Sequence, residues 1–138
     1  MEKNMIKSLN LGIILSASLI SSSVFAAPQY LITHNRTNVE SDAYVITQGG
    51  TIPSGHPTKA NSDGQVMWGL VKLICFGNIV NNSCSALIKM ETNTSHPVEL
   101  GKVTMNLDTG DITPKSLVAN GYVLTVNNPG EVTLSYAK

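Results

Sequence analysis

Apolar residues recur at every second position through most of the chain beyond residue 26, and this alternation constrains the fold more than any other feature. The segments that carry it are Tyr30–His34, Ala43–Thr47, Ser83–Glu91, Lys102–Leu107, Tyr122–Val126 and Val132–Tyr136. A period of two places alternate side chains on opposite faces of a strand, so each segment is expected to bury one face. The same part of the chain shows no amphipathic helical spacing over three turns.

Val66–Phe76 is apolar on both of its strand faces. Strands of that kind are usually central and covered on both sides, so this segment is predicted to be a long buried strand. Trp68, the single tryptophan of the chain, lies within it and is expected in the core.

Turn residues separate the alternating segments. Asp108–Asp111 and Asn127–Gly130 each contain a glycine placed for a hairpin loop. Short alternating strands with regular turns predict an all-β fold, a small antiparallel β-sandwich or barrel of about seven or eight short strands.

The first 26 residues have the layout of a cleavable signal peptide. Lys3 and Lys7 precede the apolar run Leu11–Ile20, and Val24 and Ala26 fit the small residues before a cut after Ala26. The run is shorter than the roughly 20 residues that span a bilayer. The sequence therefore predicts a signal peptide at 1–26, one β-rich domain at 27–138 without a membrane span, and a secreted or periplasmic location.

Cys75 and Cys84 are the two cysteines of the chain. An exported protein meets an oxidising compartment, so the pair is predicted to form a disulfide. The loop between them is rich in asparagine and glycine, which suits a hairpin that would bring the two thiols onto facing strands.

Charge and motif content exclude whole classes of function. Beyond residue 26 there are seven basic and eight acidic side chains, so nothing draws the domain to nucleic acid. His34, His56 and His96 lack metal-binding spacing and are expected to be exposed loop residues, with no metal or cofactor. The chain lacks a G-x-S-x-G motif, and Pro53–His56 lacks its strand-to-helix context, so catalysis is not favoured.

The irregular stretch Gln48–Gln65 and the Gly77–Ser83 tip are the expected binding surfaces, since long loops in small domains are often functional. The residues singled out are Pro53, Ser54, His56, Asn78, Asn81 and Asn82. The leading hypothesis is a non-catalytic binding protein that recognises an unknown protein or surface ligand. A protease inhibitor would be one such protein, since the disulfide would brace the loop tip.

Two alternatives stay open. One is an extracellular hydrolase with an unrecognised site, because the members of a catalytic triad need not be neighbours in sequence. The other is a structural subunit of a surface assembly. The alternating segment Glu131–Lys138 with Tyr136 resembles the terminal strand of exported pilus subunits, whereas the cysteine spacing departs from that family, and membership is not inferred.

Overall fold

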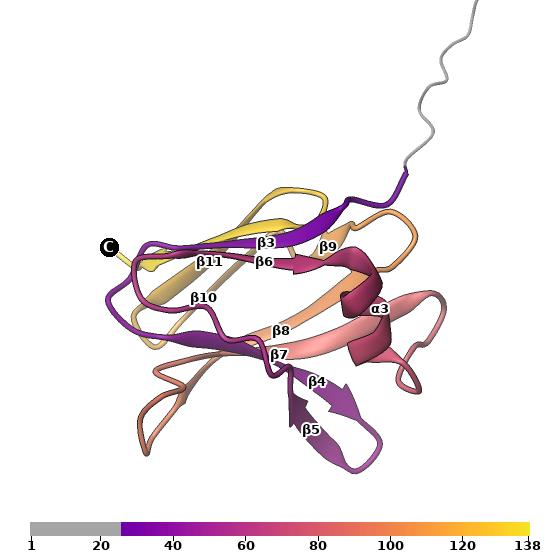
Figure 1. Cartoon of the computed structure of the whole chain (residues 1–138). Helices are drawn as coiled ribbons and strands as arrows, with labels where there is room; N and C mark the ends of the chain where they lie inside the picture. The colour runs from indigo at the N-terminus through magenta and orange to yellow at the C-terminus, as the bar shows by residue number, and fades with distance from the viewer. Residues whose placement is uncertain (1–25) are drawn as a thin grey trace, which may run out of the picture.

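Two β-sheets lie face to face in the structure, a computed structural model that describes residues 26–138 (Figure 1). Apart from its last residue, the predicted signal peptide lies outside the described residues. Within the described range no helix is long and apolar enough to cross a bilayer.

The first layer, called the β3 sheet, has the strand order β10-β11-β12-β3-β6. Its strands are β3 (Tyr30–Asn35), β6 (Asp63–Met67), β10 (Ser116–Ala119), β11 (Tyr122–Asn128) and β12 (Glu131–Tyr136). All neighbours pair antiparallel except β12 and β3, which run parallel with Leu134 opposite Asn35.

The second layer, called the β4 sheet, is antiparallel throughout and has the order β5-β4-β7-β8-β9. Its strands are β4 (Ser41–Thr47), β5 (Gly50–Pro53), β7 (Ser83–Met90), β8 (Val98–Asn106) and β9 (Ile112–Thr113). Strands β10 and β11 pack over β8, which brings the two layers together. The fold is therefore a β-sandwich, as the alternation predicts.

The expected inward faces form the core. Met90, Leu124 and Leu134 are almost fully buried, and Val103, Met105 and Leu107 are buried as predicted. Ten strands occur in the described residues because β5 and β10 add to the expected set. Both are four residues long. Strand β5 is exposed throughout, and β10 has three apolar residues in a row, so neither sequence shows the alternation.

The prediction of one long strand at Val66–Phe76 is wrong. Strand β6 ends at Met67, and α3 (Trp68–Cys75) follows it directly. Trp68, Val71 and Cys75 form the buried side of this helix. A short run that is apolar on all sides fits both a strand and a buried helix, so its period cannot decide between them.

The Cys75–Cys84 disulfide is present, with an S–S distance of 2.11 Å. The expected hairpin around it is wrong, because Cys75 ends α3 and Cys84 lies on β7. The bond therefore ties the helix that crosses one end of the sandwich to the β4 sheet (Figure 1).

Candidate functional site

A cavity of about 250 Å³ lies between the two sheets. Its walls come from the inner faces of both layers and from the buried side of α3. The apolar wall includes Leu31, Val66 and Leu134 of the β3 sheet, Val45, Ala86 and Met105 of the β4 sheet, and Val71 and Ile74 of α3. Protein interiors contain few voids larger than a water molecule, so this cavity departs from ordinary core packing.

The cavity is bounded by the way the chain crosses between the layers. The segment 54–58 runs beside β4, with hydrogen bonds from Ser54 N to Ala43 O (2.9 Å) and from Thr58 N to Ser41 O (2.7 Å). Thr58 packs so tightly on Gly64 of β6 that a Cβ there would lie 2.7 Å from its Oγ1. Thr58 therefore connects the two sheets, since it bonds to β4 and packs on β6. Helix α3, which follows β6 and is disulfide-bonded to β7, connects them a second time.

Polar side chains gather on the part of the lining that segment 54–58 contributes. Ser54, His56 and Thr58 border the cavity there, together with Asp42 of β4 and Gln65 of β6. The register puts the side chains of Asp42 and Gln65 on the outer faces of their sheets, opposite Lys89 and Ile32. Asp42 is only 9% exposed. Its Oδ1 accepts hydrogen bonds from the N–H of Ala43 at 2.8 Å and from the Ser54 hydroxyl.

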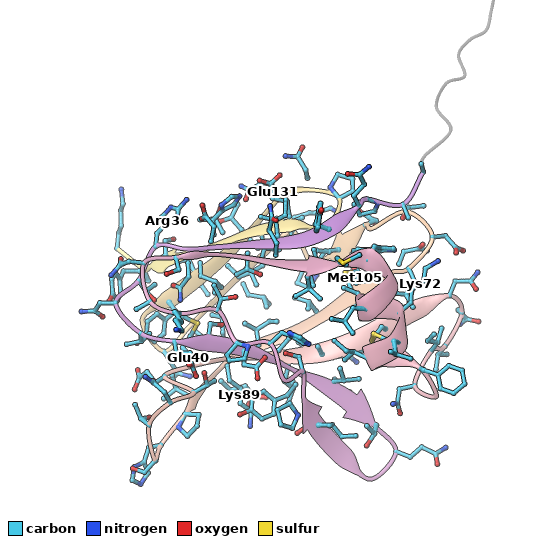
Figure 2. The ribbon with its side chains drawn as sticks, in the orientation of Figure 1. Arg36, Glu40, Lys72, Lys89, Met105 and Glu131 are labelled. Atoms are coloured by element: carbon cyan, nitrogen blue, oxygen red, sulfur yellow. A yellow bond between two sulfur atoms is a disulfide. The ribbon has the colours of Figure 1, made fainter. Side chains whose placement is uncertain are left out.

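Burial raises the pKa of the Asp42 carboxyl, and the hydrogen bonds from Ser54 and Ala43 offset only part of that effect. Asp42 is a partly desolvated acceptor at the edge of β4 beside segment 54–58. Glu40 and Lys89 lie on the same side of the molecule (Figure 2), where the Lys89 ammonium sits 4.4 Å from the centre of the Tyr44 ring.

Ser54, His56 and Asp42 are neighbours without forming the relay of a serine hydrolase. The Ser54 hydroxyl donates to Asp42 directly, and it is the backbone N–H of His56 that donates to the Ser54 oxygen at 3.0 Å. A catalytic serine needs a hydrogen bond to the imidazole ring, which in turn needs its carboxylate partner. The arrangement suits hydrogen bonding to a ligand better than nucleophilic attack.

The three histidines occupy unlike positions. His56 and His96 are exposed loop residues, as expected. His34 is not an exposed loop residue: it lies on β3, within the predicted strand Tyr30–His34, and its ring contacts both Asp63 and Glu131. Within residues 26–138, no group of three or more His, Cys, Asp or Glu side chains could hold a metal ion.

The six predicted binding residues do not form one site. Ser54 and His56 line the cavity, whereas Pro53 is exposed at the end of β5. Asn78 and Asn81 line an open surface groove together with Gln48 and Gly49, so the two predicted loops do meet there. Asn82 is exposed, and its carbonyl accepts a hydrogen bond from Leu107 N at 2.8 Å.

Asp42 escaped the sequence prediction. It precedes the predicted strand Ala43–Thr47, whereas β4 begins at Ser41, and nothing in the residues around it signals that segment 54–58 covers it. The one available signal is a carboxylate close to an apolar alternation, Ala43 and Val45, which is weak by itself.

Comparison with known proteins places the chain among exported proteins. A family model described as the type II secretion system (T2SS) substrate NttC matches residues 3–137. The crystal structure of the Legionella pneumophila type II secretion system substrate NttC is similar, with 55% sequence identity and a TM-score of 0.77. The similarity covers 80% of this chain and 100% of that chain. No curated protein matches. The family match confirms the expected secreted or periplasmic location.

Proposed function

Because the chain belongs to the family of the type II secretion system substrate NttC, we propose that it leaves the cell by that system and binds a small apolar ligand between its sheets. The observation that carries the binding proposal is the apolar cavity of about 250 Å³. No chemical step is part of the proposal, since the polar groups at the cavity hydrogen-bond to one another and not in a catalytic relay.

Volume supports a ligand. An engineered apolar cavity of about 150 Å³ stays dry and takes up benzene, so a larger one accommodates a longer hydrocarbon body. The cavity is partly open to the surface, so a ligand that enters it would displace water from the apolar wall, which is favourable.

The binding proposal is tested by filling the cavity. Ala86 is on the wall at β7, and Ala86→Leu adds three carbons there. The exported protein should enhance the fluorescence of phenylnaphthylamine, and octanol should displace the dye. Ala86→Leu should bind the dye weakly while melting at the same or a higher temperature.

The matched control is Val118→Leu, which enlarges an exposed side chain on β10 away from the cavity and should leave dye binding unchanged. Equal dye binding by the wild type and Ala86→Leu would place the dye elsewhere. In that case, or if the wild type binds no dye at all, the cavity is not a ligand site.

The export proposal needs its own experiment. The processed protein should accumulate in the medium of secretion-competent cells and in the periplasm of cells that lack the type II system. Appearance in the medium of both strains would show a different route of export.

A second candidate function is recognition of a protein through the open groove. Ile79 and Val80 are 42% and 69% exposed beside the amides of Gln48, Asn78 and Asn81. Apolar side chains rimmed by amides suit a protein partner. Val80→Asp should then reduce binding of the exported protein to target cells, whereas Ala86→Leu should not, and the opposite pattern would assign that binding to the cavity.

A further inference from the structure

The strand register decides which polar side chains of the β3 sheet face the cavity. Thr33 of β3 is opposite Gly64 of β6, and Leu31 is opposite Val66. Leu31 and Val66 pack against the core. Side chains two positions apart share a face of a strand, so Thr33 and the inner side of Gly64 also face the space between the sheets. Both residues line the cavity.

The Thr58 side chain occupies the space that a side chain on Gly64 would take. A Cβ on Gly64 would lie 2.7 Å from Oγ1 of Thr58, so the Thr58 hydroxyl lies over the inner face of β6. Thr58 is 9% exposed and lines the cavity. Its backbone N–H and carbonyl bond to Ser41, whereas its hydroxyl has no hydrogen-bond partner among residues 26–138. A buried hydroxyl without a partner costs free energy, which a polar group on a ligand would recover.

No carboxylate, lysine or arginine of the described residues faces the cavity. Asp42 borders it, but its side chain is on the outer face of the β4 sheet, opposite Lys89. The other carboxylates, the lysines and the arginine of residues 26–138 are not part of the lining. His56 also borders the cavity, and it is exposed. An ionised head group between the sheets would therefore lose its hydration without gaining a counter-ion.

We infer that the cavity takes an uncharged ligand with a hydrocarbon body and one polar group, such as a medium-chain alcohol, and that this group hydrogen-bonds to the Thr58 hydroxyl. The inference rests on the proposed ligand-binding function and names the class of ligand. A threonine hydroxyl both donates and accepts, so it pairs with the hydroxyl of an alcohol in either direction. The cavity volume suits an alkyl chain of about eight carbons, longer than the six-carbon ring that fits a smaller cavity.

The first test compares octanol, octylamine and octanoate, which share one alkyl chain and differ in the head group. Each is titrated against phenylnaphthylamine bound to the exported protein at neutral pH, where the amine and the acid are both ionised. Octanol should displace the dye at a concentration at least about tenfold lower than either ion requires, because only the ions lose a charged hydration shell.

The second test removes the hydroxyl. Thr58→Val replaces it with a methyl group and keeps the shape of the side chain. Octanol binding should weaken about fivefold, the effect of one neutral hydrogen bond, whereas butylbenzene, which has no polar group, should displace the dye as before. Thr125→Val is the matched control, because Thr125 is exposed on β11 and does not line the cavity, so every compound should bind as in the wild type.

The possible outcomes separate the inference from the proposed function. Octanoate or octylamine that binds as tightly as octanol would overturn the inference of an uncharged ligand. Octanol that binds equally well to Thr58→Val and to the wild type would overturn the role of the Thr58 hydroxyl. Displacement of the dye by butylbenzene would leave the apolar site in place in both cases. Failure of all four compounds to displace the dye would overturn the proposed function itself. The wild-type series decides the charge of the ligand even if Thr58→Val does not fold.

Discussion

His34 on β3 donates a hydrogen bond from Nε2 to Oε2 of Glu131 on β12, at 2.6 Å. The other ring nitrogen, Nδ1, lies 2.9 Å from Oδ1 of Asp63 on β6. Arg36 also contacts that carboxylate, at 2.8 Å. Arg36 and Glu131 project from the face of the sandwich opposite Lys89 (Figure 2). A protonated imidazole thus links three adjacent strands of the β3 sheet across its outer face.

The stability of the fold should therefore fall as the pH rises above neutral. The hydrogen bonds to Glu131 and Asp63 raise the pKa of His34 above 6.5. Its contribution to stability is fully present below about pH 6.5 and is lost as the pH rises through the raised pKa. Urea midpoints measured at steps from pH 6 to pH 9 should decline in the wild type. His34→Gln should flatten that decline, whereas His96→Gln at an exposed loop should not.

The contribution of this cluster to stability should also be lost at acid pH, when Asp63 and Glu131 become protonated. The His34 hydrogen bond is the largest cause that lowers the pKa of Asp63 and of Glu131. Their contribution is present above the unfolded pKa values and is lost as the pH falls through the lowered ones.

A urea midpoint that rises steadily from pH 6 to pH 9 in the wild type would contradict the assigned role of His34.

Reduction of the Cys75–Cys84 bond should lower the melting temperature. The two residues are nine positions apart, and closing so short a loop contributes about 2–3 kcal/mol in the chain-entropy model. The double variant Cys75→Ala, Cys84→Ala should show the same loss and become insensitive to reductant. A wild type that melts at one temperature with and without reductant would show that the bond does not stabilise the fold.

Much of the sheet structure could be predicted because alternation of apolar and polar residues shows which side chains of a strand face the core. Cys84, Ala86, Ile88 and Met90 are inward on β7 as expected. The helix was missed because Trp68–Cys75 is only eight residues long and carries apolar Leu73 on its exposed side, which hides its helical period.

The cavity could not be predicted from the sequence at all. It depends on how far the layers separate beside Ala86 and on where segment 54–58 crosses between them, and both depend on packing between residues distant in sequence. The disulfide was predicted from its compartment and not from its geometry. Its prediction therefore survived although the hairpin around it was wrong.

Loss of the Trp68 hydrogen bond should destabilise the sandwich. The indole Nε1 donates to the carbonyl of Leu107 at 3.0 Å, and Trp68 is 6% exposed. Trp68→Phe keeps an aromatic ring and leaves that buried carbonyl without its donor, at a cost of about 1–3 kcal/mol. Urea unfolding followed by circular dichroism measures it. Tyr30→Phe, at an exposed ring, is the control. Equal urea midpoints for the two variants would show that the Trp68 hydrogen bond does not stabilise the fold.

Pro28 packs against two turn glycines, Gly110 and Gly130. Substitution of either should destabilise the fold more than substitution of a turn glycine that has no close neighbour. A Cβ on Gly110 would lie 2.7 Å from Cγ and Cδ of Pro28, and φ there is +81°. Gly121 has a similar φ of +87° with nothing within 4 Å, so it isolates the backbone effect. Gly121→Ala should cost about 1–2 kcal/mol for the left-handed backbone alone. Gly110→Ala should add about 1–3 kcal/mol for the clash.

A double-mutant cycle separates the two contributions. Pro28→Ala removes the Cγ and Cδ atoms that a Gly110 side chain would meet, and leaves only the looser approach to Gly130 N at 3.3 Å. In that background Gly110→Ala should therefore cost little more than Gly121→Ala does in the wild type. Urea unfolding of the four variants measures the coupling. Additive costs would mean that residues near Pro28 relax without strain, and the start of the described chain would then be only loosely docked on the Gly110 turn.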